Sequence, residues 1–542
     1  MILRGSIIDP VQRRAYPGAI HVEGERIVEI KAEGPDAKKP EDLPPPYILP
    51  GFVDGHVHIE SSMLTPREFA RVAVRHGTLA AMPDPHEIAN VLGIDGVRYM
   101  MDMANDVPFT FGFGVPSCVP STPFETAGGA LDSKEVAELL KDPRVTHLSE
   151  MMNAPGVIHH DPEVMAKIQA AKDVDKPIDG HAPLLSGEDL KTYVAAGISN
   201  DHECSTADEA REKLAAGLDI MIRNGSAARD FDALLPILHE APERCSFCAD
   251  DKHPDEFLKH HINAMVAPAV ADGVPLYDVL RAASVNATRH YKIDLGLLQT
   301  GDFADFIVLE NLVDFKPVQA WHHGRDLLAD DFQKSAPATL SYLPNNFKAT
   351  PVTAADFAWT KASSRVIGVT DGLLVTEALP AIQTSDWPND ADPDLLKLIV
   401  LNRYQAGARP AVAPVKGLGP IRGAIASSVG HDSHNIIAAG SSDSAIAAAV
   451  NVLIENHGGL AVSDGSGRVL ASLPLPIAGL MMAGTAEEAG AAYLACNRAA
   501  QKIGTTLVAP FMTLSFLALP VIPHLKLTDK GLFNGDTFQF EA

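Results

Sequence analysis

Short apolar runs alternate with amphipathic segments from residue 51 to about residue 298. The apolar runs have the length of strands, and the segments between them repeat apolar positions at helical spacing. Strands that alternate with helices indicate parallel βαβ units. Eight such runs predict a (β/α)8 barrel, and they end near His58, Asp84, Gly114, Glu150, His181, His202, Asn224 and Asp250. Helices are expected between them at residues 66–75, 133–141, 162–172, 186–196 and 205–216, the last with Ser205 as its N-cap.

Both flanks of this region show short strand patterns. Residues 1–50 include a predicted hairpin around Glu23-Gly24-Glu25, and residues 299–345 return to short strands. Because both ends of a closed barrel can reach one sheet, we expect the two flanks to form one small β-sandwich domain. Residues 350–542 add strand and helix patterns rich in Ala and Gly. The predicted fold class is therefore α/β: a TIM-like barrel at 51–298, the flanking β domain, and a C-terminal α/β domain.

Composition narrows the range of partners. The chain has 542 residues, 46% hydrophobic and 21% charged, which is ordinary for a globular protein with a large core. A formal net charge of −25 argues against nucleic acid or an anionic membrane as a partner. The N-terminus has no leader pattern and no apolar run reaches membrane length, so we expect a cytoplasmic protein. Five scattered cysteines do not form a disulfide framework, and Cys245 and Cys248 are expected to pack in a strand.

Metal-ligand residues recur at the predicted strand ends. His56 and His58 are two residues apart on one strand, so both imidazoles face the same side. Catalytic groups of such barrels gather at the carboxyl ends of the strands. Four histidines and two carboxylates would satisfy one or two first-row divalent metals, and the six residues are His56, His58, Glu150, His181, His202 and Asp250. Each also has a structural alternative, such as a helix cap for Glu150 or a hydrogen-bonded core position for His181.

Longer motifs carry a family resemblance. They lie at residues 50–63, 84–93, 150–157, 180–183, 201–203, 248–254, 431–437 and 473–481. In these segments the chain resembles the amidohydrolase superfamily and, within it, the bacterial adenine deaminases. The His-x-His pair alone would specify only the superfamily. The segments Pro85-His86-Glu87 and Asp250-Asp251-Lys252-His253-Pro254 are narrower signals.

The resemblance implies a hydrolase that converts adenine to hypoxanthine and ammonia in purine salvage. It implies manganese or iron, with zinc as a further option, commonly as a pair of ions. His56 and His58 would hold the more buried metal, and His181 and His202 the second. Glu150 would bridge them in place of a carbamylated lysine. Metal-bound hydroxide would attack C6, with Asp250 as metal contact and proton shuttle. We also expect a homo-oligomer, with a dimer as the preferred state.

Several roles near this site stay open. Many related deaminases carry a glutamate soon after the fifth-strand histidine, whereas His181 is followed by Ala-Pro-Leu-Leu-Ser. The donor of the ring-nitrogen proton must then lie elsewhere, with Glu203, Glu87 and Glu60 as candidates; each could instead orient a metal-bound histidine. Asp84 and His86 could contact substrate or support the site. Asp251 could replace Asp250 as the ligand if the strand ends one residue later.

Two further alternatives concern the C-terminal unit and the activity. The cluster His431-Asp432-Ser433-His434 is either a solvated loop or a part of the C-terminal unit that covers the barrel mouth, contributes to the site or binds another metal. The chain could instead hydrolyse a cyclic amide such as a hydantoin or dihydropyrimidine, although the usual carbamylated lysine has no counterpart at Glu150. A catalytically dead barrel kept as an oligomeric scaffold is the third reading.

Overall fold

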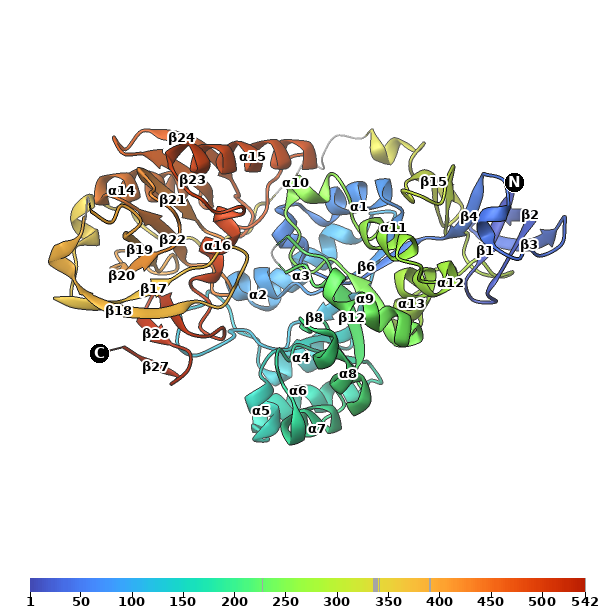
Figure 1. The fold of residues 1–542 in the computed structure, drawn as a ribbon, viewed down its shortest axis with the longest axis horizontal. Coiled ribbons are helices and arrows are strands. Elements are labelled where there is room, and N and C mark those ends of the chain that lie inside the picture. Colours follow the sequence, from blue (N-terminus) through green and yellow to red (C-terminus); the bar gives the residue numbers. More distant parts are fainter. Residues whose placement is uncertain (227, 335–339, 341, 389–390, 542) are drawn as a thin grey trace.

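The central unit of the computed structural model is a parallel barrel, and the structure describes residues 1–226, 228–334, 340, 342–388 and 391–541 (Figure 1). The barrel strands are β5 (Phe52–Val57), β6 (Thr78–Pro83), β7 (Thr110–Phe111), β8 (Phe113–Val115), β9 (Val145–Met151), β10 (Ile178–Gly180), β11 (Asn200–Asp201), β12 (Asp219–Arg223) and β13 (Cys245–Cys248). They pair in parallel as β5-β6-β7, β8-β9-β10 and β11-β12-β13. The ring closes where Val57 bridges Asp250, whose N–H donates to the His56 carbonyl at 3.0 Å.

The predicted strand ends agree with the structure. Gly112 alone separates β7 from β8, so the described residues form eight barrel positions, as the apolar runs predict. Each predicted end lies within two residues of an observed one; β9 ends at Met151 and β13 at Cys248. The predicted α/β fold class is confirmed. The carboxyl ends of the strands therefore carry the residues that the sequence marks as metal ligands.

Helices cover the outside of the barrel. They are α1 (Pro66–Arg75), α2 (His86–Leu92), α3 (Ile94–Ala104), α4 (Ser133–Leu139), α5 (Ala154–Ile158), α6 (Pro162–Asp173), α7 (Gly187–Ala195), α8 (Ala207–Ala216), α9 (Phe231–Glu240), α10 (Pro254–Phe257), α11 (Asn263–Ala271), α12 (Leu276–Leu280) and α13 (Asn286–Tyr291). The prediction of Ser205 as the cap of α8 is wrong. The cap is Thr206, whose side-chain oxygen accepts a hydrogen bond from the Glu209 N–H at 3.3 Å. Thr206 lies three residues before Glu209, whose backbone N–H has no partner within the first helical turn.

A seven-stranded sheet flanks the barrel on the right of Figure 1. Its order is β16-β15-β14-β4-β1-β2-β3, from β1 (Ile2–Asp9), β2 (Arg14–Glu23), β3 (Arg26–Ala32), β4 (Tyr47–Pro50), β14 (Phe306–Leu309), β15 (Pro317–His322) and β16 (Arg325–Asp326). β14 runs antiparallel to β4, so segments before and after the barrel share one sheet. The apolar run that leads to His56 is divided at Gly51, where a Cβ would collide with the Leu79 side chain.

The C-terminal unit, on the left of Figure 1, is an eight-stranded sheet with helices on both faces. Its order is β18-β17-β20-β19-β22-β21-β23-β24, from β17 (Ser363–Gly368), β18 (Glu377–Gln383), β19 (Leu396–Leu401), β20 (Ala411–Lys416), β21 (Gly423–Ser427), β22 (Ile436–Gly440), β23 (Gly459–Asp464) and β24 (Val469–Pro474). Along β19, Leu398 and Val400 pack in the cluster with α15 (Ala486–Ile503) and α16 (Pro510–Phe516). Ile399 and Leu401 pack toward α14 (Asp443–Glu455). Period-two alternation thus buries both faces.

A small sheet ties this unit to the barrel. It consists of β25 (Leu525–Thr528), β26 (Gly531–Asn534) and β27 (Gln539–Phe540). The Thr528 hydroxyl donates to the Phe124 carbonyl at 2.9 Å, and Asn435 Nδ2 donates to the Thr126 carbonyl at 2.9 Å.

Among the helices of the described residues, none has the length and apolar character needed to cross a membrane.

We propose domain boundaries of 1–50 plus 299–345, 51–298 and 350–542. The sheet memberships above support this division. Residues 335–339 and 341 of the first domain, and 389–390 and 542 of the third, lie outside the described residues.

A buried ion pair positions two of the loops at the barrel mouth. Lys213 Nζ donates to Asp201 Oδ2 at 2.9 Å and to the Ala182 carbonyl at 2.6 Å. The Asp201 carboxylate also accepts the backbone N–H groups of Ala182, at 2.8 Å, and Glu203, at 3.1 Å. Burial works to raise the pKa of Asp201, but the Lys213 ammonium and these donors outweigh it and lower the pKa to about 2. The residues next to His181 and His202 are thereby held in place.

Replacing Lys213 by Met is expected to destabilise the barrel by about 3–5 kcal/mol, since it leaves the Asp201 carboxylate buried without its cation. Calorimetric melting and hydrogen exchange over residues 178–216 measure the effect. Because the folded pKa of Asp201 lies below the unfolded value of about 4, the stabilisation is complete above that value and is lost as pH falls toward 2. The control is Lys191→Met, which removes an exposed pair with Glu188 and should leave melting unchanged. Equal melting of the two variants would contradict this role.

Candidate metal centre

Six predicted ligand residues meet at the carboxyl ends of the barrel strands. His56 Nε2 lies 3.2 Å from His58 Nε2, which lies 3.3 Å from Asp250 Oδ1. Glu150 lies between two groups of nitrogens. Its Oε1 is 3.5 Å from His58 Nε2, and its Oε2 is 3.2 Å from His202 Nε2 and 2.7 Å from His181 Nδ1. One Glu150 oxygen therefore faces each group of nitrogens.

The chemistry of this donor set fits divalent transition metals. Imidazole nitrogens and carboxylate oxygens from His56, His58 and Asp250 lie within 4.8 Å of one another, as do those from His56, Glu150 and His202. His58 Nδ1 is 3.1 Å from the Asp84 carbonyl, a contact that needs its proton on Nδ1 and leaves the Nε2 lone pair facing the cluster. The site can hold one or two divalent cations with the ligands that the sequence predicts.

Electrostatics keep two of the ligands, His56 and Glu150, in forms that suit a metal. Burial, with His202 and His58 as neighbours, lowers the pKa of His56 well below its usual range. That imidazole is therefore neutral at physiological pH. Burial works to raise the pKa of Glu150, but the histidines around it, His181 first, outweigh this effect and lower the pKa. A neutral imidazole and an ionised carboxylate are the forms that bind metal.

Arg223 is a site residue that the sequence reasoning missed. It ends β12, and its guanidinium donates to Asp250 Oδ2 at 3.0 Å and to Asp230 Oδ2 at 2.7 Å. It also contacts Glu203, whose Oε1 is 3.4 Å from His202 Nε2. The predicted strand end at Asn224 was one residue away, and a basic residue closing an apolar strand was the available signal. Arg223 joins Asp250 and Glu203 into one charged group.

The remaining candidates lie on the other side of Glu150. His86 Nδ1 is 3.3 Å from Glu150 Oε1 and 3.3 Å from Asp84 Oδ2. Asp251 accepts a hydrogen bond from the Ser61 hydroxyl. Asp250, rather than Asp251, therefore faces the histidines. Glu60 accepts the Ile88 N–H at 3.2 Å and turns toward α2.

The C-terminal loop at His431 is buried against the barrel, so the reading of a solvated loop is wrong. His431 and His434 are 4% and 0% exposed. His431 Nδ1 lies 2.8 Å from Glu87 Oε1, and His434 Nε2 contacts Glu87 Oε2. The loop can be buried because the imidazoles of His431 and His434 pair with the Glu87 carboxylate of the barrel. The C-terminal unit therefore packs directly on the predicted site.

One cavity of about 420 Å³ opens onto this cluster. Its polar lining is His58, His86, Glu87, Glu150, His181, His202, Glu203, Arg223, Asp250, Asp251, His431 and Asp432. Its apolar lining comes from both units and includes Met152, Leu184, Leu185, Leu374, Val375, Phe516, Leu519, Val521 and Ile522. Glu60 and Asp84 are not among the described residues that line it. The C-terminal unit thus forms a wall of the cavity.

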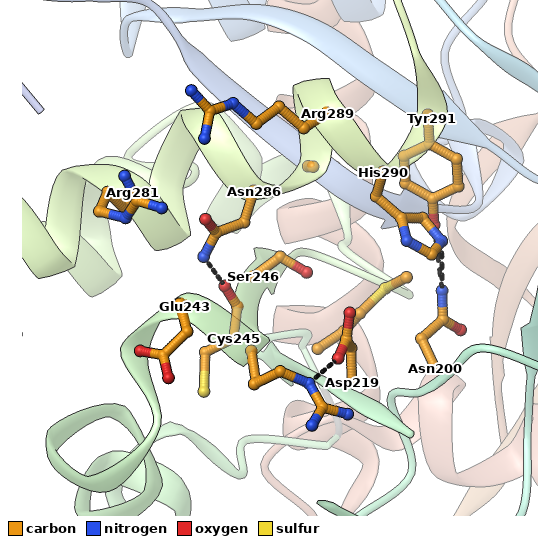
Figure 2. Close-up of a pocket in the computed structure, with 13 residues that line it drawn as sticks. Asn200, Asp219, Glu243, Cys245, Ser246, Arg281, Asn286, Arg289, His290 and Tyr291 are labelled. Atoms are coloured by element: carbon orange, nitrogen blue, oxygen red, sulfur yellow. Dashed lines mark hydrogen bonds and ion pairs between the residues drawn. The ribbon is translucent and has the colours of Figure 1, made fainter. Parts of the chain in front are cut away.

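A second cavity, of about 340 Å³, lies at the opposite end of the barrel (Figure 2). Figure 2 shows Asn286 reaching Cys245 at the start of β13, where its Nδ2 donates to the carbonyl at 2.7 Å. His290 turns toward Asn200, with 3.4 Å between the two side-chain nitrogens. None of the predicted site residues lines this cavity. These contacts lie at the amino-terminal face of the barrel, where the residues of this fold contribute to stability.

Comparison with known proteins agrees with this geometry. The model of the amidohydrolase family matches residues 47–348. The chain belongs to the amidohydrolase family. A second model, of the adenine deaminase C-terminal domain, matches residues 373–539. An adenine deaminase of Salinibacter ruber is 47% identical over 99% of this chain and 98% of its own length. One of Methanosarcina barkeri is 44% identical over 99% and 98%. Within the family, the chain is a member of the adenine deaminases.

Solved structures also show likeness over part of the chain. The N-acetyl-D-glucosamine-6-phosphate deacetylase of Mycobacterium smegmatis matches 60% of this chain and 99% of its own, with 17% identity and a TM-score of 0.46. The dihydropyrimidinase of Brevibacillus agri matches 60% and 95%, with 13% identity and a TM-score of 0.45.

Replacing Glu150 by Gln is expected to lower metal affinity at least tenfold, since one charge and one bridging oxygen are lost between the two groups of histidines. Metal content after dialysis against a weak chelator, measured by elemental analysis, tests this. Glu163→Gln is the control, because that carboxylate only accepts hydrogen bonds from Ser133 at the surface. Metal content equal to wild type in the Glu150 variant would refute the bridging role.

Proposed function

We propose that the protein hydrolyses adenine to hypoxanthine and ammonia in purine salvage. The observation that carries this proposal is the likeness to adenine deaminases over the whole chain, which includes the C-terminal unit that walls the cavity. The alternative substrate, a cyclic amide, has no comparable support, because the bridging position holds Glu150 and not lysine. The protein belongs to an enzyme family and keeps the full set of ligand residues, which disfavours a dead scaffold.

We propose that the site takes two divalent ions, manganese or iron, with zinc as a further option. His56, His58 and Asp250 would hold the more buried ion, and His181 and His202 the second, with Glu150 shared. When bound, such ions lower the pKa of a coordinated water toward neutrality and polarise the reacting ring. The two-sided placement of the Glu150 oxygens supports the count of two.

The cavity suits a flat, neutral heterocycle. Apolar side chains such as Phe516, Leu519 and Met152 form its walls, and carboxylates and imidazoles form its floor. Apolar walls with a few fixed polar groups bind the faces of a ring and leave its edge to be read by hydrogen bonds. An amino group at the ring edge can donate to the carboxylates of the floor.

Asp250 is the group that we assign to proton transfer. Its Oδ1 faces His58 and its Oδ2 accepts from Arg223. Burial works to raise its pKa, but His58 and Arg223 outweigh burial and hold the pKa well below the usual range. The carboxylate is therefore ionised and able to take a proton from the attacking water. As the C6–O bond forms and the C6–N bond breaks, the same proton passes to the departing nitrogen and ammonia leaves.

Glu203 is our candidate for the group that takes the second proton of the attacking water and passes it to the ring nitrogen. It lines the cavity, and its side chain is 14% exposed. Glu87 is held by three histidines and fits a catalytic role less well, and Glu60 is not among the described residues that line the cavity. We assign His86 and Asp251 as groups beside the substrate, and Glu60 and Asp84 as supports behind them.

Two wider properties complete the proposal. The net charge of −25 supports a small-molecule partner and disfavours nucleic acid. We further propose a cytoplasmic homo-oligomer, with a dimer as the preferred state, which light scattering of the purified protein would test.

Metal-replete protein is expected to release one ammonia and one hypoxanthine per adenine consumed. Ammonia detection coupled to chromatography of the purine product measures this. Dihydrouracil and hydantoin serve as comparison substrates. Metal-replete protein that is inert toward adenine and hydrolyses a cyclic amide would overturn the proposal.

Replacing Asp250 by Asn is expected to lower kcat by about 10²–10⁴, the range for loss of a positioned acid–base group. Steady-state ammonia release gives kcat, and bound metal is measured on the same sample. The matched control is Asp219→Asn, since Asp219 pairs with Arg244 at the opposite end of the barrel. Near-normal kcat in the Asp250 variant with metal still bound would exclude its role in proton transfer.

A further inference from the structure

The apolar wall that the C-terminal unit adds to the cavity is thin. Phe516 and Leu519 belong to a small hydrophobic cluster that is separate from the larger cores of this unit, and Leu374 packs against it. Val375, the next residue, also lines the cavity and is 45% exposed. A segment with few buried apolar contacts opens easily unless polar contacts hold it. The position of this wall therefore depends on hydrogen bonds.

Lys526 forms two of these hydrogen bonds. It lies in β25 and is fully buried. Its Nζ donates to the Leu374 carbonyl at 2.8 Å and to the Phe516 carbonyl at 3.1 Å. Phe516 ends α16, whereas Leu374 precedes β18, so the two acceptors come from segments that are far apart in the sequence. One ammonium thus joins the two segments that carry the wall.

The ammonium of Lys526 has no charged partner. Among the described residues, its hydrogen bonds go to the two carbonyls, and no carboxylate pairs with it. Burial lowers the pKa of this ammonium to about 7. Moving an unpaired ammonium out of water is unfavourable, and an apolar side chain of similar length is tolerated better at such a position. Lys526 therefore contributes hydrogen bonds to the wall rather than a gain in stability.

Thr376 ties the same two segments a second time. Its backbone N–H donates to the Pro523 carbonyl at 3.0 Å. Its hydroxyl donates to the Leu525 carbonyl at 2.8 Å and accepts the His524 N–H at 3.1 Å. Pro523 lines the cavity as well. The residues beside Leu374 are thereby fixed to the chain that follows α16.

Phe516 is also held at its ring. The ring stacks on the His431 imidazole, with 4.5 Å between the ring centroids and 20° between the ring planes. His431 is itself fixed, because its Nδ1 lies 2.8 Å from Glu87 Oε1. Lys526 thus holds the backbone of Phe516, and His431 holds its ring. The face that Phe516 presents to the cavity therefore has one fixed orientation.

We propose that Lys526 is a positioning residue for substrate binding, because its two hydrogen bonds set the spacing between Leu374 and Phe516 in the cavity wall. This inference rests on the proposed hydrolysis of adenine, whose flat ring would lie against that wall. Lys526 is not among the described residues that line the cavity, so it acts through the residues that it holds. A wall that moves loses contact with the ring faces and leaves the metal-binding groups of the barrel in place.

Replacing Lys526 by Met is expected to raise KM for adenine about tenfold, the lower end of the range for losing a methylene-sized apolar contact. We expect kcat to stay unchanged, as it does when uniform binding is lost. Steady-state ammonia release gives both constants, and equilibrium dialysis of hypoxanthine measures binding directly. The matched control is Lys176→Met, since Lys176 also donates to two carbonyls, of Leu140 and Asp142, away from the cavity lining. Lys526→Gln keeps two N–H donors and is expected to recover part of the lost affinity.

The outcomes separate this positioning role from the proposed function. Wild type that is inert toward adenine refutes the proposed function, and hydrogen exchange then tests the wall alone. Active wild type with the same KM and the same hypoxanthine affinity as Lys526→Met refutes the positioning role. A fall in kcat with KM unchanged refutes it as well, because the wall would then act on the reacting groups and not on binding.

Hydrogen exchange tests the wall without any turnover. In Lys526→Met and in Thr376→Val, exchange is expected to become faster over residues 371–376 and 512–519 and to stay unchanged over β9. The melting temperature of Lys526→Met is expected to match that of wild type, because Met removes a buried unpaired charge. Unchanged exchange at both segments, or faster exchange throughout the barrel with a lowered melting temperature, would overturn the proposal.

Discussion

The carboxylate of Glu150 is the group on which the arrangement of the site depends. It is 3% exposed at the end of β9, with one oxygen toward His58 and His86 and the other toward His181 and His202. An ionised carboxylate in that position is strongly destabilising unless several groups compensate it. Parallel strands supply them, because neighbouring strand ends reach the same rim of the barrel. The closed ring of strands is thus also the frame of the metal site.

The C-terminal unit completes the site through a second buried carboxylate. Glu87 stands in the first turn of α2 and is contacted by His431 and His434, which lie about 340 residues further along the chain. Without the C-terminal unit, the Glu87 carboxylate would lack two of its partners, and without the barrel, His431 and His434 would lack theirs. The same unit brings Phe516 and Leu519 to the cavity, so that docking both pairs the charge of Glu87 and adds an apolar wall. Its fold and the chemistry of the barrel are therefore coupled.

The sequence predicted the barrel and placed six candidate ligand residues at its strand ends, because both inferences depend on local patterns. Strand length, helical spacing and the i, i+2 rule at His56 and His58 require no knowledge of distant contacts. Arg223 was missed because its role comes from Glu203 and Asp250, which follow the neighbouring strands β11 and β13. The environment of His431 was undecided for the same reason. A polar tetrapeptide is buried only if its side chains find partners, and here the partner is Glu87, which is distant in the sequence. The cap of α8 differs by one residue, since Ser205 and Thr206 are both good caps.

The surplus of buried carboxylates bears on why the chain would keep this site intact. An uncompensated buried charge costs about 3–5 kcal/mol, and the carboxylates of the cluster are faced by histidines and by the guanidinium of Arg223. A cation present at 1,000 times its dissociation constant contributes about 4 kcal/mol to the folded state. The two quantities are of the same size, so a bound cation would contribute to the stability of the barrel mouth. A scaffold without a metal would gain stability from apolar side chains at these positions, whereas this chain carries carboxylates and imidazoles there. The polar composition of this buried cluster thus favours a metal site on physical grounds that are separate from family membership.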